Sequence, residues 1–242
     1  RSYSVTGVQT CALPILAYKL SGRPSMDIDL SMRDDFADPA TIAELVNKVF
    51  TRAFDEKGFV VLDYSFTARP EIASDPIWGG YEIRFKILAH ELDRTLSDQR
   101  ARQRHAVQYG SKLQQNIIIQ ISKHEYYHST VILINTIPTQ VYTPQMVCIE
   151  KLRALCQQMN EYTLNTTRHP RARDFYDIVL LQEHYTMNVT DTDFVRDVIA
   201  SFASKKVPLS LLPHLEQYRE YHRRDFTAVL QTIPSEIGRA HV

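Results

Sequence analysis

Residues 22–31 read GRPSMDIDLS, with two aspartates separated by a single isoleucine. Successive side chains of a β-strand point to opposite faces, so Asp27 and Asp29 share one face and Ile28 lies on the other. Two carboxylates about 5 Å apart repel by roughly 3 kcal/mol at an effective dielectric constant near 20, unless a cation lies between them. Hard oxygen ligands of this kind suit Mg²⁺. The stretch predicts a strand that presents a metal site, and the alternative is a turn with two solvated acids.

Three more stretches of the first half have the composition of strands, because they are rich in branched and aromatic residues and are bounded by polar or glycine breaks. They are FVVLDYSF (59–66), YEIRFKIL (81–88) and NIIIQIS (116–122). Apolar residues at helical spacing predict an amphipathic helix over 39–57, which Gly58 ends. The charged stretch 90–112 is expected to be a surface helix or connection.

The second half has the pattern of helices. Thr143 followed by Pro144 is a helix start signal, because the hydroxyl caps free amides and proline needs no donor in the first turn. Four helical stretches follow, at 143–159, 170–185, 192–206 and 211–230. The sequence therefore predicts an α+β protein in which a mixed sheet is followed by a C-terminal helical bundle.

The composition narrows the functional classes. The formal net charge is zero, which gives the whole chain no general attraction to nucleic acid or membranes. No apolar stretch is long enough to span a bilayer, so we expect a cytoplasmic protein without a membrane partner. Cys148 and Cys156 lie eight residues apart on a predicted helix, where buried thiols are more plausible than a disulfide or a metal cluster.

The two ends of the chain look like translated sequencing-adapter DNA. Reverse translation of Val5–Ile15 and of Glu236–Val242 gives sequencing-adapter DNA whose shared part is mutually reverse-complementary. We therefore exclude residues 1–15 and 236–242 from the fold. The remaining chain divides into a predicted first domain, 16–142, and a helical domain, 143–235.

Two helical stretches contain further candidates for chemistry. Lys151 lies inside IEKLRAL, and Asp174 and Asp177 are three residues apart in RARDFYDIVLL, so they share a helix face. A lysine can act as a point charge on phosphate, and an aspartate can orient it or accept a proton from a hydroxyl. The alternatives are a solvated helix lysine and an ordinary surface ion cluster.

In this order and spacing, RPSMDIDLS, IEKLRAL and RARDFYDIVLL resemble the nucleotidyltransferase toxins of the AbiEii/AbiGii type, the MenT-like family. The resemblance covers nearly the whole chain between the excluded ends. It implies a polymerase-beta-like nucleotidyltransferase sheet, a helical bundle and an active site in the cleft between them. It also implies Mg²⁺, a nucleoside triphosphate, an acceptor such as tRNA and an antitoxin encoded by a neighbouring gene.

The resemblance also assigns roles to individual residues. Asp27 and Asp29 would hold the metal, Lys151 would contact nucleotide phosphate, and Asp174 would complete the catalytic set. Ser25, two residues before the first aspartate, matches the family pattern and could touch a phosphate oxygen. Together with Lys151 and Asp177 it forms the expected nucleotide-binding set.

This sequence departs from the family pattern in two places. The glycine-rich turn that approaches the triphosphate is expected about a dozen residues before the aspartates, where Leu13, Pro14 and Ile15 stand instead. This predicts a truncated and impaired enzyme. In the strand IIIQIS, Gln120 takes the place where many relatives have a third acid, and Glu125 is a candidate to compensate.

Two other functions stay open at this point. One is a catalytically degenerate module that binds a nucleotide or a partner, in which Gln120 reflects lost chemistry. The other is a DNA-binding regulator built on the last helices, although HLEQYREYHRRDF (214–226) mixes acids with bases. The basic loop at Arg168, His169, Arg171 and Arg173 is expected either to contact phosphates or to be solvated.

Overall fold

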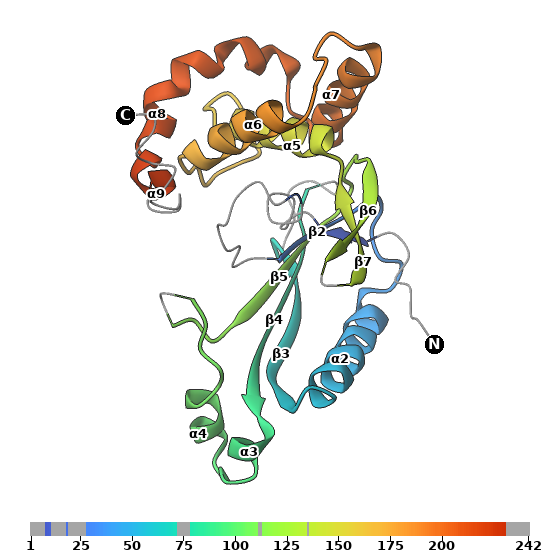
Figure 1. The fold of residues 1–242 in the computed structure, drawn as a ribbon, viewed down its shortest axis with the longest axis vertical. Helices are drawn as coiled ribbons and strands as arrows, with labels where there is room; N and C mark the ends of the chain where they lie inside the picture. Colours follow the sequence, from blue (N-terminus) through green and yellow to red (C-terminus); the bar gives the residue numbers. More distant parts are fainter. Residues whose placement is uncertain are drawn as a thin grey trace. The chain divides into compact units, whose positions relative to one another are not determined.

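A computed structural model of the chain describes residues 8–10, 18, 28–71, 78–110, 113–134 and 136–230. The chain forms two compact units, one of residues 26–123 and one of residues 1–25 with 124–242. We name them the central unit and the helical unit and describe each by itself (Figure 1). The predicted domain boundary between residues 142 and 143 stays a prediction.

The central unit has a four-stranded arrangement in the order β3-β4-β5-β2. The strands are β2 Ile28–Met32, β3 Phe59–Arg69, β4 Gly80–Ala89 and β5 Ile117–Ser122. Strand β2 runs parallel to β5, while the β3–β4 and β4–β5 pairs are antiparallel. The predicted strands and the mixed sheet are therefore confirmed.

Helix α2, Pro39–Asp55, lies along the sheet of the central unit (Figure 1). The Asp38 side chain accepts hydrogen bonds from the backbone N–H groups of Ala40 and Thr41, which caps the helix. Its apolar residues pack against a cluster from β2, β4 and β5 whose buried members are Met32, Tyr81, Ile83, Phe85, Ile119 and Ile121. The opposite face of the sheet carries polar side chains such as Asp29, Gln120, Glu82 and Arg84, together with the buried Leu88.

The charged stretch after β4 contains two short helices, α3 His90–Asp93 and α4 Gln99–Arg104. Asp98 caps α4 by accepting from the backbone N–H of Ala101. Neither helix contains a buried residue. The predicted surface position of this stretch is therefore confirmed.

The helical unit also contains strands. Strand β6, Ser129–Ile134, and β7, Ile137–Tyr142, form an antiparallel hairpin, and β1, Val8–Thr10, runs parallel to β7. This hairpin was not predicted, although STVILI (129–134) has the β-branched composition of the other strands.

Four helical segments follow the hairpin. They are α5 Pro144–Cys156, α6 Ala172–His184, α7 Thr192–Ser204 and a broken last segment made of η1 Leu209–Tyr218, α8 Arg219–Arg223 and α9 Phe226–Leu230. Thr143 caps α5 as predicted, by accepting from the backbone N–H of Met146. The continuous last helix was predicted wrongly: its first part is a 3₁₀ helix that contains Pro213, whose missing N–H and ring do not suit an α-helix interior.

Helix α5 forms the centre of the helical unit. It packs against α6 and α7, and its buried residues include Met146, Val147, Cys148, Ile149, Leu155 and Cys156. Both thiols are free and buried, as predicted, and burial raises the pKa of Cys148 to about 11 and that of Cys156 to about 12. Within the described ranges no helix has the length and apolar character needed to cross a membrane.

Candidate functional site

Lys151 lies between two aspartates of the neighbouring helix. Its Nζ atom is 3.0 Å from Asp174 Oδ1 and 2.7 Å from Asp177 Oδ2. Asp174 and Asp177 share one face of α6 because they are three residues apart, and α5 packs against that face. The structure therefore brings together three of the predicted site residues.

This ion cluster is mostly shielded from solvent. The exposed fraction of the side chain is 18% for Lys151, 9% for Asp174 and 2% for Asp177. Burial alone would lower the pKa of Lys151, but the two carboxylates outweigh it and raise this pKa above its usual value. Lys151 is therefore a fixed positive charge at neutral pH.

Asp174 also has a second cation as its partner. Arg171, in the turn before α6, forms an ion pair with Asp174 through Nε, and its side chain is 40% exposed. Burial would raise the pKa of Asp174, but Lys151 and Arg171 lower it below its usual value. Asp174 is therefore ionised and already engaged by two donors.

The simpler alternatives for these residues are wrong. Lys151 is not a solvated helix lysine, and Asp174 and Asp177 are not surface acids. The basic loop before α6 is also largely used within the protein, since Arg168 donates to the backbone carbonyls of Met159, Asn160 and Tyr162. Arg168 and Arg171 thus have internal partners, and the backbone N–H of His169 donates to Gln158 at 2.8 Å.

Asp29 occupies the predicted position on its strand. Ile28 and Leu30 pack against the apolar cluster under α2, whereas Asp29 is exposed on the other face of β2. The alternation inferred from the sequence is therefore confirmed for the described part of the stretch. Asp27 and Ser25 lie outside the described residues, as do Leu13, Pro14 and Ile15 at the place of the expected glycine-rich turn.

The strand register places a row of oxygen-bearing side chains across the central unit. Asp29 on β2 is opposite Gln120 on β5, which is opposite Glu82 on β4. Glu82 accepts from Arg84 at 2.8 Å and from Arg69 at 3.3 Å. Glu82 was not among the predicted site residues, although the alternation of YEIRFKIL (81–88) puts it on the polar side of its strand.

Glu125 does not take over the role of the missing acid. It is 6% exposed and belongs to the helical unit, where its carboxylate pairs with Arg153 at 2.9 Å and with Lys205 at 3.1 Å. This corrects the expectation that Glu125 compensates for Gln120. The two cations hold the carboxylate inside the protein.

The predicted magnesium site is only partly described. Among the described residues no group of three or more histidine, cysteine, aspartate or glutamate side chains is arranged to hold a metal ion. Asp29 and Gln120 supply hard oxygen atoms of the type that Mg²⁺ prefers. Asp29 belongs to the central unit and Lys151 to the helical unit, so the prediction that they form one site stays a prediction.

With this geometry in place, comparisons with known proteins identify the family. A family profile described as "Nucleotidyl transferase AbiEii toxin, Type IV TA system" matches residues 11–239. The chain belongs to the AbiEii nucleotidyltransferase toxin family. The predicted α+β class and the predicted family are therefore confirmed. A comparison with curated proteins gives no match.

Two solved structures are similar at low identity. An antigenic nucleotidyltransferase-like protein from Paracoccidioides brasiliensis is 13% identical, with a TM-score of 0.40, over 85% of this chain and 84% of that chain. A presumed nucleotidyltransferase from H. pylori is 16% identical, with a TM-score of 0.41, over 91% of this chain and 89% of that chain. Similarities this distant carry no argument about the site.

Proposed function

We propose that this AbiEii-family chain transfers a nucleoside monophosphate from a nucleoside triphosphate to an acceptor hydroxyl, with tRNA as the acceptor. The observation that supports this most is the shielded Lys151, held by Asp174 and Asp177 in a chain of a nucleotidyltransferase family. The Lys151 side chain stays 18% exposed, and Arg171, the second cation beside Asp174, is 40% exposed, which leaves positive charge where a phosphate could approach.

Lys151 would act on the triphosphate as a point charge. Its ammonium group keeps its proton throughout the neutral range, and the Lys151 side chain is 18% exposed, which would let a phosphate oxygen approach it. The two aspartates fix the ammonium group before the substrate arrives. Such preorganised charge stabilises the negative charge that develops during phosphoryl transfer.

Asp174 would orient the reacting groups rather than store a proton. A carboxylate whose pKa lies below its usual value is a weak base at neutral pH. It can still accept a hydrogen bond from the attacking hydroxyl and keep Lys151 and Arg171 in place. Asp177 is the more buried of the two carboxylates and would hold Lys151 from the other side.

The metal would be held by Asp29 together with Asp27. The exposed carboxylate of Asp29, next to the amide of Gln120, fits a hard cation with room for water and phosphate ligands. When bound, Mg²⁺ aligns the triphosphate and neutralises its charge. Asp29 has to keep its carboxylate towards the polar face of β2, and Ile28 and Leu30 anchor the strand for that purpose.

The experiment is a label-transfer assay. The purified chain is incubated with each of four α-labelled nucleoside triphosphates, Mg²⁺ and total tRNA. We expect label on RNA from one or more nucleotides, and we expect Asp29→Asn and Lys151→Met to abolish it while the circular dichroism spectrum is retained. If no label reaches any RNA or protein, the proposed function is wrong.

A second function is favoured by Gln120, because an amide in the row beside Asp29 binds Mg²⁺ weakly. The chain would then be a nucleotide- or partner-binding module without catalysis. Calorimetry with and without Mg²⁺, combined with a pyrophosphate assay, separates the two functions. Nucleotide binding that needs no Mg²⁺ and releases no pyrophosphate favours the module, whereas Mg²⁺-dependent binding with pyrophosphate release favours the enzyme. An antitoxin from a neighbouring gene is expected as a regulator in either case.

A further inference from the structure

Helix α6 has two stripes of residues at helical spacing. Asp174, Asp177, Ile178 and Leu181 are buried, and the two aspartates on this stripe meet Lys151 of α5. Ala172, Phe175, Tyr176 and Val179 form a second stripe, in which Phe175 is 36% and Val179 is 50% exposed. Helix α6 therefore has a partly exposed apolar surface next to the residues that pair with Lys151.

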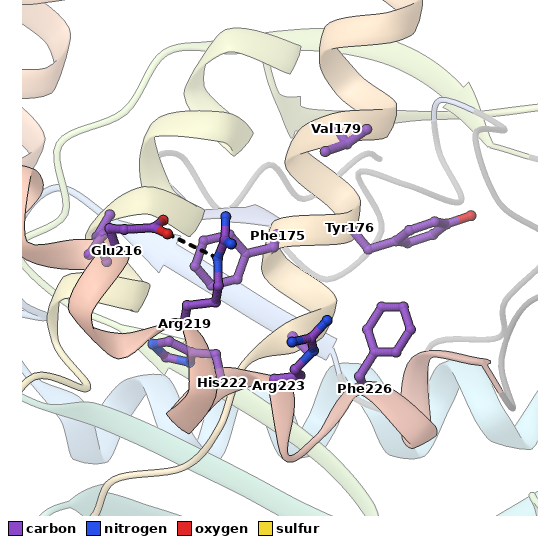
Figure 2. A pocket seen from close by; sticks show the side chains of 10 residues that line it. Phe175, Tyr176, Val179, Glu216, Arg219, His222, Arg223 and Phe226 are labelled. Carbon is purple, nitrogen blue, oxygen red and sulfur yellow. Dashed lines mark ion pairs between the residues drawn. The ribbon is translucent and has the colours of Figure 1, made fainter. Parts of the chain in front are cut away.

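The second stripe is one wall of a pocket. The pocket has a volume of about 570 Å³, and its opposite wall comes from η1, α8 and α9, which lie within the helical unit. Figure 2 shows Phe175, Tyr176 and Val179 on α6 and, on the segments facing it, Arg219, His222, Arg223 and Phe226. This volume lies within the range of small-ligand sites.

A buried hydrogen-bond donor lines this pocket. His222 is 2% exposed, and its Nδ1 accepts from the backbone N–H of Arg171 at 3.1 Å. The ring proton must therefore be on Nε2, which has no hydrogen-bond partner in the described part of the chain. Burial, followed by the positive charge of Arg171, lowers the pKa of His222, so the ring is neutral. An unpaired buried N–H is unfavourable, so the ring position of His222 is held by its Nδ1 contact and by packing on Phe175.

Two arginines on the rim of the pocket can bind an anion. Arg219 pairs with Glu216 and Arg223 pairs with Glu220, each at 3.1 Å. All four side chains are at least 68% exposed, and ion pairs this exposed contribute little. A phosphate can therefore replace the carboxylates at small cost, and it matches the fork of a guanidinium group.

The pocket is connected to the Lys151 cluster by a short chain of contacts. His222 accepts from the backbone of Arg171, Arg171 pairs with Asp174, and Asp174 pairs with Lys151. A ligand in the pocket is therefore held on the same helix that positions the proposed catalytic residues. These contacts favour a role for the pocket in binding the substrate of the reaction that Lys151 would assist.

We propose that this pocket binds one unpaired nucleotide of the acceptor RNA, with its base against Phe175, Tyr176 and Phe226 and its phosphate on Arg219 and Arg223. Aromatic side chains stack on any base, and cations next to them hold the backbone. His222 packs edge-to-face on Phe175, with ring centroids 5.4 Å apart, and so supports the aromatic surface on which the base would stack. The proposal rests on transfer to RNA as the proposed function.

Binding is measured by fluorescence anisotropy, with an end-labelled single-stranded heptaribonucleotide and the purified chain, without nucleoside triphosphate. We expect Phe175→Ala to weaken binding about tenfold or more, and the double variant Arg219→Gln/Arg223→Gln by a similar factor. The matched control is Arg52→Gln/Arg196→Gln, which removes two exposed arginines that are also paired with nearby acids. It should change affinity less than threefold. Equal losses in the control and the pocket variants would overturn the proposal.

A second measurement uses the wild-type chain, so it does not depend on the stability of a variant. The same RNA with one 5-iodouridine is photo-crosslinked, and the modified peptide is identified by mass spectrometry. A crosslink to Phe175, Tyr176 or Phe226 supports the proposal, and crosslinks confined to other peptides overturn it. Competition with ATP distinguishes the two sources of a base: displacement of this crosslink by ATP at its own binding constant would assign the pocket to the triphosphate and overturn the proposal.

The same variants separate this proposal from the proposed function. If Lys151→Met loses transfer but keeps RNA affinity and the crosslink, both stand. If the wild-type chain binds RNA in the pocket and never transfers label, the pocket stands and the proposed function is wrong. If transfer proceeds at full rate in Phe175→Ala and in Arg219→Gln/Arg223→Gln, the pocket proposal is wrong and the function stands.

Discussion

Helix α5 carries two cations, Lys151 and Arg153, only two residues apart. Each pairs with carboxylates inside the helical unit, but their side chains differ in exposure to solvent. Lys151 contacts Asp174 and Asp177 and has a side chain 18% exposed, while the more exposed Arg171 pairs with the same Asp174. Arg153 contacts Glu125 and Glu150 and is 6% exposed. We call the first group the open cluster and the second, which also includes Lys205, the sealed cluster.

The sealed cluster connects elements of the helical unit. Glu125, before β6, accepts from Arg153 of α5 and pairs with Lys205, which follows α7, while Glu150 accepts from Ser201 of α7 at 2.7 Å. Burial and the neighbouring Glu125 raise the pKa of Glu150, although Arg153 opposes them. The charged groups of the sealed cluster all pair with one another inside the protein, so we assign this cluster to the stability of the fold. The open cluster differs in that the side chain of its lysine is 18% exposed, against 6% for Arg153.

The largest expected difference between the clusters is in catalysis. Lys151→Met should lower the rate of nucleotidyl transfer roughly 10²- to 10³-fold, because it removes a preorganised positive charge from the phosphate. The rate is measured by label transfer to tRNA at saturating nucleotide. Arg153→Met, with its rate corrected for the folded fraction, should stay within about threefold of the wild type. An equal loss of rate in both variants would show that the open and sealed clusters do not differ in catalysis.

The next effect is on stability. Arg153→Met should lower the free energy of unfolding by about 3–5 kcal/mol, because it leaves Glu125 and Glu150 buried with one cation fewer. Urea unfolding followed by circular dichroism measures this change. Lys151→Met leaves Asp177 without its lysine, but it removes a more exposed side chain than Arg153 and keeps Arg171 beside Asp174, so it should cost less. A larger loss for Lys151→Met than for Arg153→Met would contradict the assignment of the sealed cluster to stability.

The open cluster should also contribute to the pH dependence of stability. The pKa of Asp174 is lower in the folded state, so its contribution is present above its usual value, near 4, and is lost as the pH falls through the folded value. The pKa of Lys151 is higher in the folded state, so its contribution is lost only in strongly alkaline solution. Urea unfolding between pH 7 and pH 3 should therefore show a steeper decline for the wild type than for Asp174→Asn. Parallel curves would show that Asp174 is not held by its cations.

The smallest effect is expected at an ion pair that belongs to neither cluster. Arg52 and Glu56 pair on the surface of α2 with side chains 78% and 62% exposed. Arg52→Gln should change the free energy of unfolding by no more than about 0.5 kcal/mol. The same urea titration provides the baseline for the other variants. A loss above about 1.5 kcal/mol for Arg52→Gln would show that exposure does not predict how much an ion pair contributes to the free energy of unfolding in this protein.

Much of the open cluster was predictable from the sequence. The three-residue spacing of Asp174 and Asp177 puts them on one helix face, and the family motifs single out Lys151. The sealed cluster was not predicted: Glu150 and Arg153 are three residues apart on α5, but Glu125 and Lys205 come from distant segments that no spacing connects to them. Local pattern gives the face of a helix, but only tertiary packing decides which distant charges meet.

The fold shows the same division. Alternation predicted the strands from Ile28 to Ser122, including the exposed side of Asp29, and helical spacing predicted α2, α5, α6 and α7. The β6–β7 hairpin was missed, and Pro213 turned the last predicted helix into a broken segment. That error matters for function, since the pocket wall opposite α6 is built from this segment.

The central claim is that the charge of Lys151 is available to a triphosphate while that of Arg153 is not. Isothermal titration of the wild type, Lys151→Met and Arg153→Met with ATP and each other nucleoside triphosphate in Mg²⁺ tests this most directly. For the preferred nucleotide, we predict that Lys151→Met weakens binding at least tenfold and that Arg153→Met, per folded molecule, stays within about twofold. Unchanged affinity in Lys151→Met would contradict the claim.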